Sequence, residues 1–329
     1  MSGQAGASAA RASLMLVLVT VVWGVSFTWT RSWQLAVREA PGGELLWSLT
    51  LIMLRMPLAL AVFALWQPRL LVAPSWAEYR GGLLLGAVFF GGFALQTWGL
   101  ASTTPALSAF FTSLCSAWVP VVGYVLYRER VAPLTLAGLA LALVGCAVLV
   151  DGWRIGRGEG LTLLGSFLFT GQVIVLDRLG KHLVPAHLTP GFILATGGLA
   201  CLGAMVLATR EPGLGVWLEW MGTLLGQRDI LLGLLCLACF STVLGFHWMN
   251  TYQPLVPATR AALIYLLEPV FSAIFSVWWG HDTLTQPLVL GGVLILGGNL
   301  LVELPGLLRA RRTVPDEEKA PARESPPGL

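Results

Sequence analysis

One carboxylic acid inside a long apolar stretch is the residue of this chain best suited to bind a proton or an amine. Glu268 lies near the middle of residues 258–279 and directly precedes Pro269. A charge at the centre of a bilayer costs about 2.5 to 3.5 kcal/mol on insertion scales, so it persists mainly where it faces a cavity or a partner. Proline lacks an N–H, which frees a carbonyl one turn earlier and predicts a kink here. The structural alternative is that Glu268 caps this freed backbone or bonds a neighbouring helix.

Two arginines are candidates to pair with that acid. Arg260 lies on the same helical face as Glu268 but about 12 Å away along the axis, at 1.5 Å per residue. Arg55 lies midway along the apolar residues 45–66, where a guanidinium can pair with a carboxylate, snorkel or hold a helix end. We expect structural pairing from both. Burial and a nearby cation change the proton affinity of Glu268 in opposite directions, and only burial favours a proton carrier near neutral pH.

A histidine and an amide form the second candidate. His247 and Asn250 are three residues apart in the apolar residues 230–250, so they share a helix face and can point into a cavity. Histidine titrates near neutral pH, which suits proton coupling. A neutral histidine bonded within a helix bundle is the alternative.

Uncharged polar and aromatic side chains complete the expected site. Each polar group alone is typical of helix–helix hydrogen bonds worth about 0.6 kcal/mol, but together they are expected to line a path. Deep aromatic rings can stack on a flat or cationic ligand, or simply face lipid. The candidates are Gln96, Gln172, Ser108, Thr112, Trp23, Phe27 and Tyr265.

No metal, cofactor or catalytic constellation accompanies these residues. Cys236 and Cys239 form a C-x-x-C, but both lie in an apolar stretch without a second pair of ligands. The sequence has no H-E-x-x-H and no G-x-S-x-G motif. We therefore predict no metal, no cofactor and no enzymatic activity, with an intramembrane enzyme as a disfavoured alternative.

The elements that must position these residues are membrane helices. The chain is 56% hydrophobic and 11% charged, and its net charge of +3 is too scattered for a nucleic-acid partner. Apolar runs of about twenty residues without alternation are helices rather than barrel strands. The fold class is therefore an all-α polytopic membrane protein with ten transmembrane helices. The expected spans are 14–30, 45–66, 81–100, 105–127, 133–150, 160–176, 190–208, 230–250, 258–279 and 287–303.

The chain repeats itself at an offset of 153 residues. Glu129, Gly138 and Gly145 return as Asp282, Gly291 and Gly298, each trio lying between and then along equivalent apolar stretches. Five helices per copy is an odd number, so the second copy enters the membrane from the opposite side. The sequence therefore predicts two inverted five-helix repeats, an arrangement typical of transporters.

Small residues on one face predict close helix packing. The repeated glycines Gly138, Gly145, Gly291 and Gly298 have a seven-residue spacing, and Gly82 and Gly86 form a G-x-x-x-G.

We expect the repeats at 13–150 and 151–304, flanked by disordered cytoplasmic tails at 1–12 and 305–329. With the N-terminus inside, ten loop Lys and Arg residues are cytoplasmic and six are external, a mild positive-inside bias. This places a multi-pass protein in a cell membrane, the inner or plasma membrane, with both termini cytoplasmic.

Several segments together resemble the EamA-type, ten-helix branch of the drug/metabolite transporter superfamily. They are "VVWGVSF", "LRMPLA", "ALQTWGLASTTPALSAFF", "YRER" and "ATRAALIYLLEPVFSAIFSVWWGHD". The resemblance covers about residues 14–303 and implies two inverted halves around a central cavity. It further implies secondary transport, commonly export, of small metabolites such as amino acids, or of drugs. The chain departs from the family at Ser116, where the family usually has proline. It also has Arg128-Glu129 and His281-Asp282 where the family has a Gly-Glu pair before the loop. The positions of the helix kinks therefore do not follow from the resemblance.

The leading hypothesis is thus a proton-linked or gradient-driven exporter of small amphipathic metabolites that works by alternating access. An ion-independent facilitator or exchanger of the same fold is the closest alternative, and a membrane scaffold is a further one. The expected partners are a small-molecule substrate and membrane lipid, with the protein a monomer or homodimer.

Overall fold

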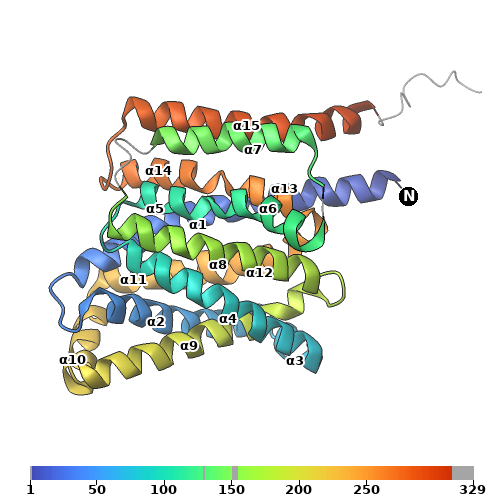
Figure 1. The fold of residues 1–329 in the computed structure, drawn as a ribbon. Helices are drawn as coiled ribbons and strands as arrows, with labels where there is room; N and C mark the ends of the chain where they lie inside the picture. The colour runs from blue at the N-terminus through green and yellow to red at the C-terminus, as the bar shows by residue number, and fades with distance from the viewer. Residues whose placement is uncertain (1, 129, 150–154, 313–329) are drawn as a thin grey trace, which may run out of the picture.

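A computed structural model describes residues 2–128, 130–149 and 155–312, and within these ranges it is helical with no strand (Figure 1). The first half contains α1 (Ser2–Ala36), α2 (Gly43–Trp66), α3 (Arg69–Val72), α4 (Trp76–Gly99), α5 (Pro105–Ser113), α6 (Cys115–Tyr127) and α7 (Pro133–Leu149). The second half contains α8 (Arg157–Leu179), η1 (Pro185–Leu188), α9 (Thr189–Arg210), α10 (Leu214–Leu225), α11 (Arg228–Cys236), η2 (Leu237–Leu244), α12 (Gly245–Tyr252), η3 (Gln253–Leu255), α13 (Ala258–Tyr265), α14 (Glu268–Trp278) and α15 (Gln286–Arg312).

The membrane class predicted from composition is confirmed, whereas the count of ten spans is not. Within the described residues, eight helices are long and apolar enough to cross a bilayer. The predicted spans 133–150 and 287–303 coincide with α7 and α15, whose described apolar parts, Pro133–Gly145 and Gln286–Gly298, are shorter than the eight. At 1.5 Å per residue, the 17 residues of α7 extend about 25 Å, somewhat less than a typical hydrocarbon core.

The two halves run in opposite directions. Successive long helices alternate in direction along the bundle, so α1 and α8, the first long helix of each half, are antiparallel (Figure 1). The beginning of α1 and the end of α15 consequently lie at the same end of the bundle (Figure 1).

The described residues near both ends of the chain are helical, whereas disordered tails were expected there. α1 begins at Ser2 and α15 continues to Arg312, because the alanine-rich "AGASAARA" and the "LLRARR" segment are composed largely of helix-favouring residues. Residues 313–329 of the predicted C-terminal tail lie outside the described residues. The structure also contains α10, a short apolar helix that the spans predicted from hydropathy do not include.

The repeated glycines of the two halves meet each other. α7 and α15 lie side by side at one edge of the bundle (Figure 1). A Cβ added to Gly145 would approach the carbonyl oxygen of Gly291 to 2.7 Å, and one on Gly298 would collide with the carbonyl oxygen of Gly138. Each duplicated glycine is therefore the close-contact partner of a glycine in the other copy.

The G-x-x-x-G pair packs a different interface. A Cβ on Gly82 would collide with the carbonyl oxygen of Leu188, and one on Gly86 with that of Phe192. The absence of side chains at these two positions thus lets α4 approach the beginning of α9.

Two equivalent helices are broken at equivalent places. The ninth predicted span divides into α13 and α14 at Leu266–Leu267, two residues before Pro269, which confirms the predicted kink. The fourth divides into α5 and α6 at Leu114, which is 153 residues before Leu267. Ser116, in place of the proline usual in the family, donates from its Oγ to the carbonyl of Ala262 in the opposite broken helix.

A third interruption lies in the eighth predicted span. η2 is a π-helical segment between α11 and α12, and its widened turn presents Ser241 and Thr242 toward α2. Segments of this type occur frequently at functional sites.

Candidate functional site

A cavity lies between the two halves, and most of the predicted site residues line it. Its walls come from α1, α2, α4, α5 and α6 of the first half and from α8, η2, α12, α13 and α14 of the second. The predicted residues that line it are Trp23, Phe27, Arg55, Gln96, Thr112, Gln172, Tyr265 and Glu268. We call this space the central cavity.

Glu268 is the acidic group of the central cavity. The break before Pro269 makes it the first residue of α14, where the N–H groups of the first turn and the helix dipole favour a negative charge. Its side chain is 6% exposed. Among the described residues no donor is bonded to its carboxylate, and Arg260 is not one of the residues that line the cavity. The carboxylate is therefore available to a ligand.

Arg55 is the cationic group of the same cavity. It is buried on α2, where Nε donates to Thr242 Oγ1 and Nη2 donates to Ser241 Oγ at 2.7 Å. The Phe93 ring lies beneath the guanidinium carbon, 5.1 Å from it to the centroid. The π-helical turn and one aromatic face thus fix the guanidinium, while the residue still borders the cavity.

Aromatic rings form the apolar walls. Trp23 lies with its ring centroid 5.6 Å from Phe246 and 5.7 Å from Tyr265, and its Nε1 donates to the Ser241 carbonyl at 3.2 Å. The Tyr265 hydroxyl donates to Gln253 Oε1 at 2.9 Å. These bonds hold the rings in place, so the three rings make a preformed surface beside Glu268 suited to an ammonium or an aromatic group.

The uncharged polar candidates divide into two sets. Gln96 Nε2 donates to Thr112 Oγ1 at 2.7 Å, and both residues line the cavity. Gln172 also lines it, and its Nε2 lies 3.3 Å from Met249 Sδ. Ser108 instead contacts Thr162 of α8, with the two hydroxyl oxygens 3.4 Å apart. Its position fits the helix-bridging alternative.

The histidine and the amide are brought together, but outside the central cavity. His247 Nδ1 and Asn250 Nδ2 lie 3.4 and 3.3 Å from the hydroxyl of Thr189 on α9. The His247 ring also packs against Phe63 and Trp66, at centroid distances of 5.5 and 5.4 Å. Neither residue lines the cavity, which corresponds to the alternative of a histidine bonded within the bundle.

Several lining residues were not among the candidates selected from the sequence. They are Ser26, Phe89, Phe93, Ser113, Cys115, Phe169, Val173, Ser241 and Phe246. The phenylalanines carry no sequence signal, because a membrane helix also presents phenylalanine to lipid. Cys115 did have one, since it lies 153 residues before Glu268, at the offset of the internal repeat.

The sequence pattern of the EamA-like transporter family matches this chain twice, over residues 10–151 and 156–304. A "Probable amino-acid metabolite efflux pump" of Salmonella typhimurium is 27% identical over 315 residues, covering 91% of this chain and 96% of that protein. The protein of the same description in Escherichia coli is 26% identical, over 92% of this chain and 97% of its own length. An "Uncharacterized transporter" of Archaeoglobus fulgidus is 25% identical over 227 residues, 69% of this chain and 70% of its own.

A solved structure titled "Crystal structure of protein" has the same fold. It superposes with a TM-score of 0.64 over 93% of this chain and 99% of that chain, at 19% sequence identity. The likeness extends over both halves of the chain.

Proposed function

Since the chain belongs to the EamA-like transporter family, we propose that it exports small amphipathic compounds with an amino group, amino acids or close relatives, by alternating access. Family membership makes the chain a small-molecule transporter rather than an enzyme. The substrate class, the direction and the mechanism are the parts proposed.

The observation that carries the substrate class is the pairing of opposite charges in one apolar cavity. No donor among the described residues bonds the Glu268 carboxylate, whereas two hydroxyls hold the Arg55 guanidinium in place, and both groups border the central cavity. A zwitterion satisfies both, with its ammonium at Glu268 and its carboxylate at Arg55. The aromatic walls favour a substrate with an apolar side chain, because contacts between that side chain and the rings offset the desolvation cost of the charged headgroup.

The broken helices support alternating access. α5/α6 and α13/α14 are interrupted at the level of the cavity, so the outer and inner segments of each can tilt separately about Leu114 and Leu267. In transporters with inverted repeats, such discontinuous helices hold the substrate while one half rocks against the other.

Export and proton coupling are proposed on two further grounds. Two relatives that cover nearly the whole chain are named as efflux pumps. Glu268 can bind either a proton or an ammonium, but not both at once, so a proton that enters from the other side displaces the substrate. This exchange gives an antiport without any further ion site.

Transport by purified protein in liposomes tests the proposal. Vesicles loaded with radiolabelled phenylalanine should release it faster when the outside is acidic than when the pH is equal on both sides. Glu268→Gln should abolish the effect of the pH gradient, because an amide cannot exchange a proton. Glu159→Gln is the matched control: Glu159 is also buried, accepts from Thr103 at 2.5 Å and does not line the cavity, so this variant should keep the gradient effect.

Two other outcomes distinguish the alternatives. Counterflow of phenylalanine that is independent of pH in both variants indicates an ion-independent exchanger of the same fold. Equal coupled flux in the wild type and in Glu268→Gln rejects the role of the carboxylate.

We further propose an inner- or plasma-membrane location with both termini cytoplasmic, in accord with the excess of Lys and Arg on that side. A single chain surrounds the whole cavity, so a monomer embedded in lipid suffices for transport, with a homodimer as the alternative state. A reporter enzyme that is active only in the cytoplasm should be active when it is fused to either end of the chain.

A further inference from the structure

A second cavity lies at one end of the bundle, apart from the central cavity. It lies between the end of α1, the beginning of α2 and the segment that joins α4 to α5. We call it the outer vestibule and define it by Arg31, Gln34, Arg38, Glu44 and Thr103. In the proposed topology this end faces outward.

A line of lining residues leads from the central cavity to the outer vestibule between α1 and α4. Ser26 and Phe27 border both the central cavity and a small opening beyond it, which Thr30 continues. The vestibule begins at the next residue, Arg31. Because positions 23, 27, 30 and 34 recur every three or four residues, one face of α1 borders all three spaces.

The line is closed in this structure by a small apolar cluster. Phe27, Leu100 and Ala109 are buried against one another between the two cavities. A substrate must therefore pass this cluster when the outward path opens, and the vestibule is the first space that it reaches.

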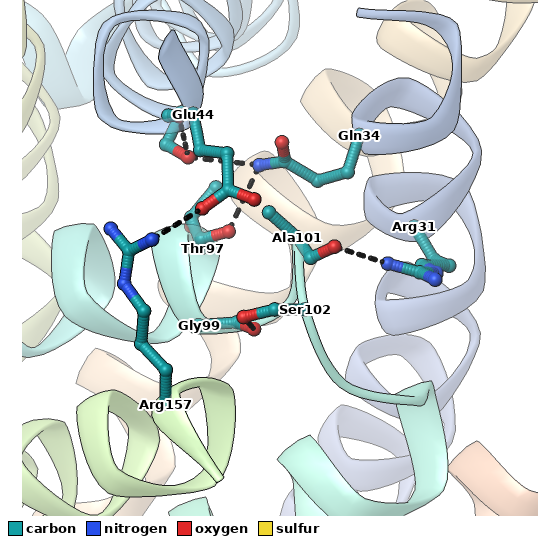
Figure 2. A network of polar contacts seen from close by, with 9 residues as sticks. Arg31, Gln34, Glu44, Thr97, Gly99, Ala101, Ser102 and Arg157 are labelled. Atoms are coloured by element: carbon teal, nitrogen blue, oxygen red, sulfur yellow. Dashed lines mark hydrogen bonds and ion pairs between the residues drawn. The ribbon is translucent and has the colours of Figure 1, made fainter. Parts of the chain in front are cut away.

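The vestibule has cationic groups in excess. Arg31 Nη1 donates to the carbonyls of Leu100 and Ala101, both at 2.8 Å, and so caps the end of α4. Figure 2 shows the bond to Ala101. Arg157 pairs with Glu44, with 3.4 Å between Nη1 and Oε2 (Figure 2). Arg38 is exposed at the vestibule and has no ion pair within the described ranges. Its guanidinium is free to bind a carboxylate.

The vestibule also has an unused acceptor. Gln34 is 4% exposed, and its Nε2 donates to Ser48 Oγ and to the Thr97 carbonyl, both at 2.9 Å (Figure 2). Its Oε1 is buried and has no donor in the described part of the chain. A buried acceptor without a donor costs roughly 1–3 kcal/mol, which a ligand N–H would recover.

We propose that the outer vestibule is a second binding site for a zwitterionic headgroup, occupied after substrate leaves the central cavity. Arg38 binds the carboxylate and Gln34 Oε1 accepts from the ammonium. The ligand class rests on the proposed function, but the site itself rests on the contacts around Gln34 and Arg38.

Equilibrium dialysis of the full-length, detergent-purified protein with radiolabelled L-phenylalanine tests the proposal. The wild type should bind two molecules per chain. Arg38→Gln should weaken one of the two sites at least about tenfold, the loss expected for a charge-assisted hydrogen bond. Arg210→Gln removes the same charge from an exposed arginine at the same end of the bundle that does not line the vestibule, so it should bind like the wild type.

The two proposals fail separately in this experiment. One bound molecule per wild-type chain, or equal binding by Arg38→Gln and wild type, overturns the vestibule site. If Glu268→Gln keeps both sites unchanged while Arg38→Gln loses one, the vestibule stands and the proposed role of Glu268 in binding fails. A competition experiment separates lipid headgroups from amino acids at the site that Arg38→Gln weakens. If glycerophosphoethanolamine displaces all the labelled phenylalanine from this site at concentrations where L-alanine displaces none, the site binds lipid headgroups and its role in export is overturned.

Discussion

Cys115 and Glu268 are equivalent residues of the two halves and line the same cavity. They are 153 residues apart, and each is the first residue of the second segment of a broken helix, α6 or α14. The duplicated backbone thus supplies two similar positions, and only one of them carries an acid. Of these two equivalent positions one therefore has a carboxylic acid and the other a thiol, so the group that can bind an ammonium lies in the second half only.

The position of Cys115 predicts that substrate protects it from alkylation. In a variant that retains Cys115 as its single cysteine, labelling by a small maleimide should slow several-fold with saturating phenylalanine, because the ligand fills the space beside the thiol. A matched variant that retains only Cys201, half-buried on α9 and not lining the cavity, should label at the same rate with and without ligand. Protection of both thiols alike would indicate a global stabilisation instead.

Arg55→Lys should lower the transport rate at least about tenfold. Arginine bonds Thr242 and Ser241 with two nitrogens of a planar group, and lysine has one ammonium on a flexible stem that cannot hold both hydroxyls in that plane. Initial rates in liposomes measure the effect. Thr242→Ser keeps the acceptor and should transport within about twofold of the wild type. An active Arg55→Lys would show that charge alone suffices.

Gly298→Ala should destabilise the pairing of α7 with α15, whereas the adjacent Gly297→Ala should not. A methyl group at Gly298 collides with the carbonyl of Gly138, but one at Gly297 meets nothing closer than Leu141 Cδ2 at 3.7 Å. Overpacking of this kind costs about 1–3 kcal/mol. Thermal unfolding in detergent gives the comparison, and equal midpoints for the two variants would contradict the close glycine contact.

The folded protein should lose stability on mild acidification through His281. Burial lowers the pKa of His281 from its usual 6.5, the charge of Arg31 acts in the same direction, and Asp282 opposes both. The folded state therefore binds the proton less well than the unfolded state, so stability present above pH 6.5 falls as the pH drops toward the lowered value. Nε2 of His281 lies 3.3 Å from Ser32 Oγ of α1, a contact that protonation changes.

Thermal midpoints at about pH 7.5 and about pH 5.5 measure this effect. The midpoint of the wild type should fall more than that of His281→Gln, which cannot take up a proton. Identical shifts would place the pH dependence at other groups.

Local physics was sufficient to predict some features of this protein. Long apolar runs must become helices in a bilayer, since no water is present to satisfy an open backbone. Pro269 lacks an N–H, so the break beside Glu268 follows from two adjacent letters of the sequence. The offset of 153 residues gives the duplication, and the odd number of helices per copy gives the inversion.

The tertiary structure alone decided which side of each helix faces inward. Trp23 and Tyr265 border the cavity, whereas His247 packs against Phe63 and Trp66. In water, the inner face of a helix is its apolar face, but in lipid an apolar side chain is equally stable on either face. The sequence pattern therefore cannot distinguish a helix face that lines the cavity from one that contacts lipid. The packing of ten separate segments around the cavity that contains Glu268 and Arg55 decides which face of each segment is the lining face.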